Sequence, residues 1–95
     1  MNTDAQTYLA RLVGRDIAQE RALLTFIGSP RKNEPAVMQD LLRKNFEIGR
    51  AQIPTRLVEA GLPADMARMV EDGFARTATA ILNGVANGQY HPAAR

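Results

Sequence analysis

Apolar side chains recur every three or four residues through most of this chain, and that spacing predicts α-helices rather than β-strands. Glycine and proline interrupt the pattern at residues 28–30, at Pro54 and at residues 61–63, where helices are expected to stop or start. We therefore predict an all-α, single-domain bundle, either closed within one chain or completed by homodimerisation. Three long helices and one short helix are expected at about residues 3–27, 34–53, 55–60 and 63–86, with a frayed tail at 87–95.

The last long helix has the clearest apolar stripe. On a helical wheel, its buried side comprises Met66, Val70, Phe74, Thr77, Ile81 and Val85. Gly73 and Gly84 lie on the same side, although glycine inside a helix costs roughly 0.5–1 kcal/mol relative to alanine. Such glycines are useful where another backbone comes close. Gly73, Thr77 and Gly84 are therefore predicted to form a strip of close approach, either within one bundle, which we favour, or to a second copy of the chain.

Four polar residues interrupt the apolar stripes of the first two helices. Asp16 and Glu20 lie in the middle of a stripe formed by Leu9, Leu12, Val13, Ile17, Leu23, Leu24 and Ile27. Asn45 and Gln52 interrupt a second stripe formed by Met38, Leu41, Leu42, Phe46, Ile48 and Ile53. Because buried polar groups generally find hydrogen-bond partners, these four residues predict a polar layer inside the bundle or an interface in which they fix orientation.

Three explanations account for Asp16 and Glu20. The first is a buried or half-buried ion pair with an arginine of another helix, for which Arg56 is one candidate. The second is a helix face that the single chain leaves partly uncovered and that meets a partner. The third, a carboxylate metal or proton-transfer site, is disfavoured because di-metal bundles use Glu-x-x-His motifs, and none of the predicted helices contains a histidine.

Composition excludes several classes of function. The chain has no cysteine, so disulfides, thiol catalysis and Cys-type zinc sites are excluded. No signal-peptide pattern is present, and no apolar run approaches the roughly 18 residues of a membrane span. We therefore expect a soluble cytoplasmic protein without a membrane partner. With five aromatic residues and no tryptophan, the core must consist mainly of aliphatic side chains.

Catalytic and cofactor-binding motifs are also missing. The only histidine, His91, lies in the predicted tail and is not expected to act as a general base. No glycine-rich dinucleotide or phosphate loop occurs. We accordingly expect no enzyme activity, no cofactor and no bound metal.

One segment loosely resembles the helix-turn-helix of bacterial regulators, since residues 53–74 outline a short helix, a turn at Gly61 and a second helix. The resemblance implies DNA binding through the corner 55–74, with Val58 and Leu62 in its core. The segment departs from that pattern at Leu57, where a small residue usually lets the helices pack closely. An ordinary helical corner is the favoured interpretation.

Basic side chains elsewhere could also contact nucleic acid. These candidates are Arg31, Lys32, Arg43, Lys44, Arg50 and Arg56. Because the formal net charge is only +2 and carboxylates alternate with the cations, nucleic-acid binding ranks second. The favoured function is a non-enzymatic helical interaction module that forms a homo-oligomer, expected to be a dimer, or binds another protein. Asp16, Glu20, Asn45, Gln52, Gly73, Thr77 and Gly84 are its predicted interface residues.

Overall fold

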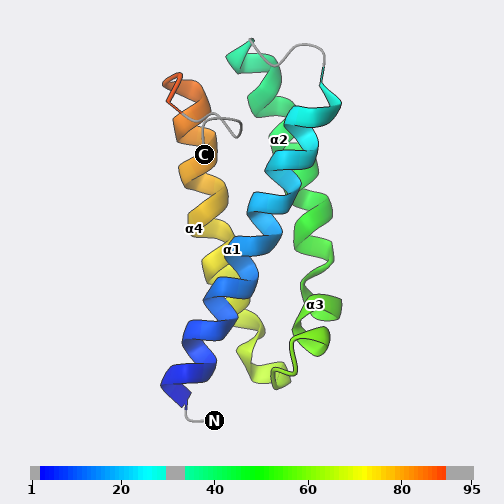
Figure 1. The fold of residues 1–95 in the computed structure, drawn as a ribbon, viewed down its shortest axis with the longest axis vertical. Helices are drawn as coiled ribbons and strands as arrows, with labels where there is room; N and C mark the ends of the chain where they lie inside the picture. The colour runs from blue at the N-terminus through cyan, green and yellow to red at the C-terminus, as the bar shows by residue number, and fades with distance from the viewer. Residues whose placement is uncertain (1–2, 30–33, 90–95) are drawn as a thin grey trace.

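The computed structural model describes residues 3–29 and 34–89, and all regular structure in this part of the chain is helical, as predicted (Figure 1). The elements in chain order are α1 (Thr3–Gly28), α2 (Pro35–Ala51), α3 (Ile53–Glu59), a single 3₁₀ turn η1 (Ala64–Met66) and α4 (Ala67–Ala86). The final helix thus begins four residues later than the sequence suggested. The reason is that residues 64–66 form the tighter turn, in which Met66 N–H donates to the Pro63 carbonyl.

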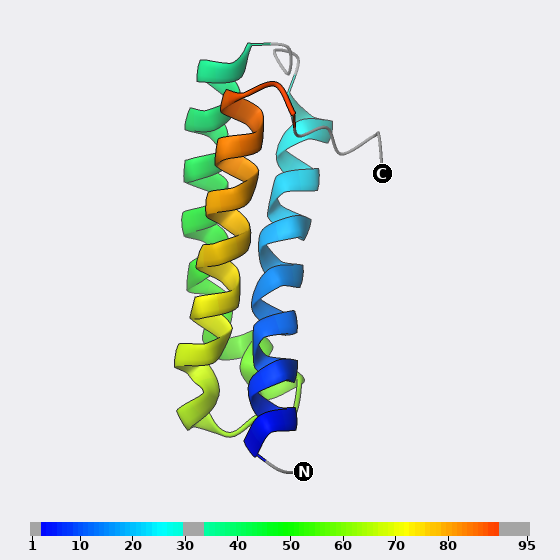
Figure 2. The same cartoon turned by 90° about the vertical axis from the view of Figure 1, so that its left-hand side faces the viewer.

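The three long helices lie side by side, with α1 and α4 running in one direction and α2 in the other (Figures 1 and 2). The short α3 and η1 connect α2 to α4 at the end where α1 begins. The molecule measures 43 × 20 × 18 Å. Its length is close to that of α1 alone, since 26 helical residues span about 39 Å. The bundle therefore has one elongated core. None of the described helices combines the length and apolar content needed to span a bilayer.

The turn after α3 follows the predicted stop signal at Gly61. This residue has a φ of +72°, in the left-handed region. Gly61 N–H donates to the Val58 carbonyl and Leu62 N–H to the Leu57 carbonyl, which together form a Schellman motif. Leu57 and Leu62 are both buried, whereas Val58 is exposed, so the prediction of a core position for Val58 is wrong. The short helix turns Leu57 toward the core instead.

The buried side of α1 includes Ile17 of the predicted stripe, and Leu9 and Val13 are partly buried against the core. Much of the rest of this side consists of small residues, which the prediction did not include. Ala10, Gly14, Ala18 and Ala22 follow one another at four-residue spacing and are all buried. The prediction for the C-terminal half of α1 is wrong, because Leu23, Leu24 and Ile27 are 48%, 47% and 72% exposed. The predicted core position of Ile48 on α2 is wrong too, since this side chain is 49% exposed.

The physical reason is a backbone contact between α1 and α4. A Cβ atom added to Gly14 would collide with the Val70 carbonyl oxygen and would lie 2.5 Å from the Phe74 nitrogen. A Cβ atom added to Gly73 would lie 2.7 Å from the Arg11 Cα atom. Only small side chains fit along such a crossing, so Leu23, Leu24 and Ile27 lie on another side of α1. The close approach at Gly73 is therefore an internal contact of the bundle.

The core between the three long helices is mainly aliphatic, and Phe26, Phe46 and Phe74 contribute its buried aromatic rings. Ile17, Met38, Leu42 and Val70 are the fully buried aliphatic side chains of largest volume. The rings of Phe46 and Phe74 meet edge to face, with centroids 5.9 Å apart. The predicted stripe of α4 is buried at Val70, Phe74, Ile81 and Val85, and Met66 of η1 continues it. Thr77 is half-buried.

Candidate interaction surfaces

A cluster of exposed aliphatic side chains lies where the end of α1 meets the side of α2. Leu23 and Ile27 are i,i+4 neighbours on α1, and Leu24 and Ile27 are i,i+3 neighbours. Leu24 shares a hollow of about 280 Å³ with Leu41 and Asn45 of α2, and Ile48 lies one turn beyond Asn45. We call Leu23, Leu24, Ile27, Leu41 and Ile48 the α1–α2 apolar face. Exposed apolar side chains grouped in this way mark interaction sites more often than scattered single residues do.

Asp16 and Glu20 lie on the exposed side of α1 and not in a buried stripe, so that part of the prediction is wrong. The small residues of α1 occupy the buried side and leave both carboxylates facing outward. Glu20 Oε2 accepts from Arg56 Nη1 at 3.2 Å, with 52% of the Glu20 and 30% of the Arg56 side chain exposed. The predicted partner Arg56 is therefore confirmed, but the pair is too exposed to contribute more than about 1 kcal/mol. Asp16 pairs with its neighbour Arg15 at 3.3 Å.

Asn45 and Gln52 are half-buried along the seam between α1 and the α2–α3 segment. Asn45 Oδ1 accepts a hydrogen bond of 2.7 Å from Arg21 Nη2, and its Nδ2 donates to the Leu41 carbonyl. The Nε atom of Arg21 is buried and has no hydrogen-bond partner. The sequence analysis did not identify Arg21, because its position beside the buried side of α1 could be recognised only once that side was known.

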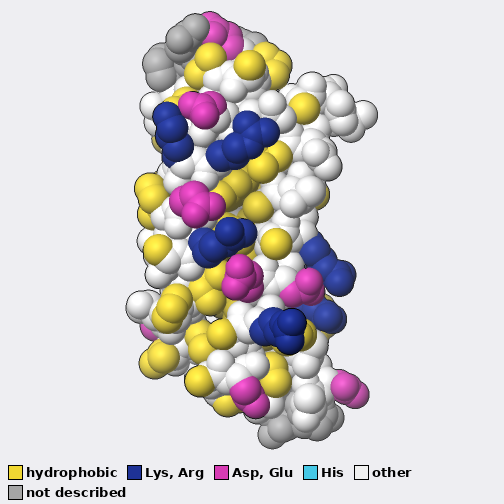
Figure 3. Space-filling view, turned by 180° about the vertical axis from the view of Figure 1, so that it is seen from behind, with side chains coloured by type: hydrophobic (Ala, Val, Ile, Leu, Met, Phe, Trp, Pro, Cys, Tyr) yellow, Lys and Arg dark blue, Asp and Glu magenta, His cyan; other side chains and the backbone are white. Residues whose placement is uncertain are grey.

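A second surface is a groove of about 350 Å³ between α2 and α4. Figure 3 views this side of the bundle, where hydrophobic side chains form a strip between Lys, Arg and acidic side chains. Phe46, Phe74 and Ala78 form the floor and are buried, whereas the cations Arg43, Lys44 and Arg50 and the carboxylate of Glu47 stand along α2. The Arg50 guanidinium lies 5.6 Å from the centre of the Phe74 ring, a cation–π contact.

The structure brings together three of the six basic residues considered for nucleic-acid binding. Arg43, Lys44 and Arg50 line the groove, whereas Arg56 is on the other side of the bundle beside Glu20. Arg31 and Lys32 lie outside the described residues, as does His91. Carboxylates accompany the grouped cations. Lys44 pairs with Asp40 at 3.2 Å, and Arg50 is 3.7 Å from both Glu47 and Glu71.

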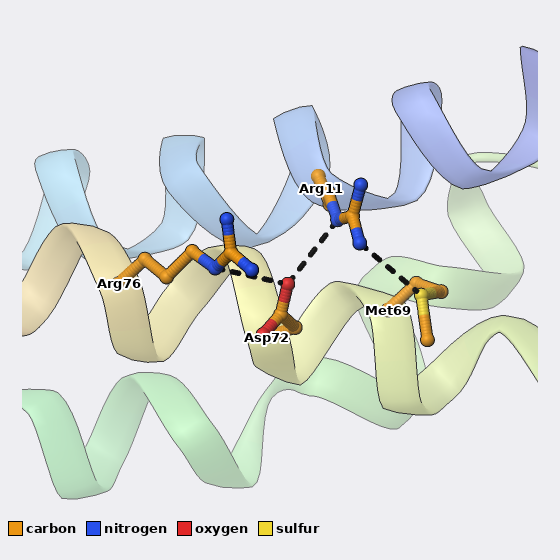
Figure 4. A network of polar contacts seen from close by, with 4 residues as sticks. All are labelled: Arg11, Met69, Asp72 and Arg76. Atoms are coloured by element: carbon orange, nitrogen blue, oxygen red, sulfur yellow. Dashed lines mark hydrogen bonds and ion pairs between the residues drawn. The ribbon is translucent and has the colours of Figure 1, made fainter.

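The corner at residues 55–74 leads into α4, and the cations on the outward side of α4 are not all free to bind a phosphate. Asp72 Oδ2 lies 3.2 Å from Arg11 Nε of α1 and 3.2 Å from Arg76 Nε one turn ahead, as Figure 4 shows. Arg11 Nη2 also contacts the Met69 sulfur at 4.0 Å. Since one carboxylate partly neutralises two arginines, this side offers a phosphate little net positive charge.

The remaining predicted interface residues are divided between the interior and the surface. Gly73 is buried against Arg11 and is not available to a second copy. Gly84 is half-buried near the end of α4, where its carbonyl accepts from Gln89 N–H at 2.7 Å. Within residues 3–29 and 34–89, no three acidic or histidine side chains are grouped so that they could hold a metal ion.

Comparison of the chain with protein-family models, with curated protein sequences and with solved structures gave no match.

Proposed function

We propose that this protein is a non-enzymatic helical interaction module that self-associates or binds a helical protein partner. The observation that supports the proposal best is the α1–α2 apolar face. Three of its large aliphatic side chains lie within five residues at the end of α1 and are about half exposed or more. Burying such a side chain fully contributes about 1.5–3 kcal/mol relative to leaving it in water. Association would remove these side chains from water without rearranging the core.

Polar groups beside the apolar face can fix the orientation of a partner. Glu20 and Arg56 form an exposed ion pair next to Gln52, and together they line a hollow of about 220 Å³. Asn45 lies between Leu41 and Ile48 along α2. Interfaces commonly surround an apolar centre with such polar groups, which contribute more to specificity than to affinity.

The test is the solution mass, by light scattering, of the natural protein and of two variants. Ile27→Glu places a charge in the apolar face at a side chain that is 72% exposed, so the fold should persist while association is lost. Tyr8→Glu is the matched control, because Tyr8 is 67% exposed on the same helix but about 28 Å away. We expect the natural protein and Tyr8→Glu to associate and Ile27→Glu to be a monomer. A monomeric natural protein at every concentration would refute self-association.

Binding of nucleic acid is the alternative, and the grouping of Arg43, Lys44 and Arg50 along one groove favours it. A fluorescent DNA duplex added to the same light-scattering samples separates the two functions. Co-migration with DNA that disappears steeply as salt is raised would support the alternative, because phosphate contacts release counterions. A salt-resistant oligomer that ignores the duplex would contradict it.

A further inference from the structure

The exposed side of α1 and the α2–α4 groove are complementary in charge and in polarity. The exposed side of α1 carries the carboxylates Asp16 and Glu20, followed by Leu23 and Ile27 at the next turns. The groove has an apolar floor, with three cations and one carboxylate among its lining residues. We propose that the exposed side of α1 in one copy docks into the α2–α4 groove of the next copy. This inference rests on the proposed self-association and specifies how it occurs.

The cations along the groove are available to an incoming carboxylate. Arg43 forms no ion pair with any other described residue. Among the described residues Lys44 pairs only with Asp40, and the two side chains are 71% and 65% exposed. Arg50 is 3.7 Å from each of its two carboxylates, longer than the 2.7–2.9 Å of a good charge-assisted hydrogen bond. Exposed pairs of this kind are weak, so their cations can be shared with Asp16 and Glu20 of another copy.

The dimensions of the two surfaces also agree. Glu20 and Ile27 on α1 are seven residues apart, as are Arg43 and Arg50 on α2, and both spans are therefore about 10 Å. Ala75 and Thr79 on the α4 wall are small and leave room beside the floor of Phe46, Phe74 and Ala78. A helix that enters such a groove is anchored by side chains at i, i+3, i+4 and i+7, and Glu20, Leu23, Leu24 and Ile27 have this spacing.

This mode of association differs from a closed dimer. The two surfaces are on different sides of the bundle, so the contact is heterologous, and a docked pair retains one free surface of each kind. A ring or an open chain of copies results, and the solution mass should rise beyond that of a dimer as concentration increases. In a closed dimer built from two identical α1–α2 faces, by contrast, the groove would remain outside the interface.

Mixing two variants distinguishes these modes. Thr79→Glu blocks the groove with a carboxylate, and Ile27→Glu blocks the α1 side. Each variant alone should be a monomer, but an equimolar mixture should form a complex of twice the 10.4 kDa monomer mass, because one intact surface of each kind remains. Ala80→Glu is the matched control for the groove variant. Ala80 is the next residue of α4, is exposed, and does not line the groove, so this variant should associate like the natural protein.

Each outcome of the mixing experiment has one meaning. If Thr79→Glu associates as well as the natural protein while Ile27→Glu does not, self-association stands and the groove is not the occupied surface. If both variants are monomers and remain monomers when mixed, the α1 side of one copy does not dock into the groove of another, and this mode of docking is wrong. If the natural protein is itself a monomer, the proposed self-association and this mode of docking are both wrong. Circular dichroism of every variant verifies that the helical fold is retained.

Discussion

Replacing Gly14 by alanine should destabilise the bundle, although the same change stabilises most helices. In an exposed helix interior, alanine is favoured over glycine by about 1 kcal/mol. At Gly14 the new methyl group meets the backbone of α4, namely the carbonyl of Val70 and the nitrogen of Phe74. Neither atom can rotate away as the end of a side chain could, so α1 and α4 must move apart.

The magnitude follows from the size of that separation. The Cβ atom would lie 2.5 Å from the Phe74 nitrogen, whereas non-bonded contacts between heavy atoms are optimal near 3.5–4.0 Å. A shift of about 1 Å between two helices forfeits up to half of the dispersion energy of the contacts beside the crossing. Overpacking of a core costs about 1–3 kcal/mol. Because the methyl group added at Gly14 meets backbone atoms of α4, we expect its cost to lie at or above the upper end of this range. After the gain in helix propensity, we expect a net loss of about 2 kcal/mol.

Thermal unfolding followed by circular dichroism at 222 nm measures this loss. For a domain of this size, 1 kcal/mol corresponds to about 4–8 °C, so the Tm should fall by about 8–16 °C. Gly28→Ala is the control, since a Cβ atom there would meet nothing within 4 Å and Gly28 does not have a positive φ. We expect its Tm to be unchanged or higher. If Gly14→Ala raises the Tm as Gly28→Ala does, the backbone contact between α1 and α4 does not exist.

Two further substitutions test individual interactions. Asn45→Ala removes the acceptor of the 2.7 Å bond from Arg21 and should cost about 1–2 kcal/mol in urea unfolding. Adding Arg21→Met should recover most of this loss, and failure to recover it would exclude the bond as its cause. Gly61→Ala should cost about 1–2 kcal/mol because φ is +72°, whereas Gly61→Asn should cost less, since asparagine tolerates the left-handed region. Equal losses for alanine and asparagine would mean that something other than φ limits this position.

Local signals in the sequence were sufficient to predict the helices and the stop at Gly61, although α3 and α4 begin at other residues than predicted. Gly61 stops α3 because only glycine adopts a positive φ without strain, and Pro54 is accommodated in the first turn of α3, where no N–H is required. The stripe from Met66 to Val85 was identified correctly because large apolar side chains at helical spacing are buried wherever a partner helix is present. These features depend on residues close together in the chain.

The buried side of α1 was decided by tertiary structure. The helical wheel placed Ile17 correctly but the end of α1 wrongly. The hydrophobicity of Ala10, Gly14, Ala18 and Ala22 is too low to outweigh Leu23, Leu24 and Ile27, so the predicted stripe included these exposed side chains. The packing of α4 decides which side of α1 is buried. Gly73 of α4 lets the backbones of α1 and α4 come so close that only small side chains fit between them. The same contact directs Asp16, Glu20 and the large side chains at the end of α1 outward. The candidate interaction face therefore depends on which helix packs against α1, and this information is not contained in the periodicity of α1 itself.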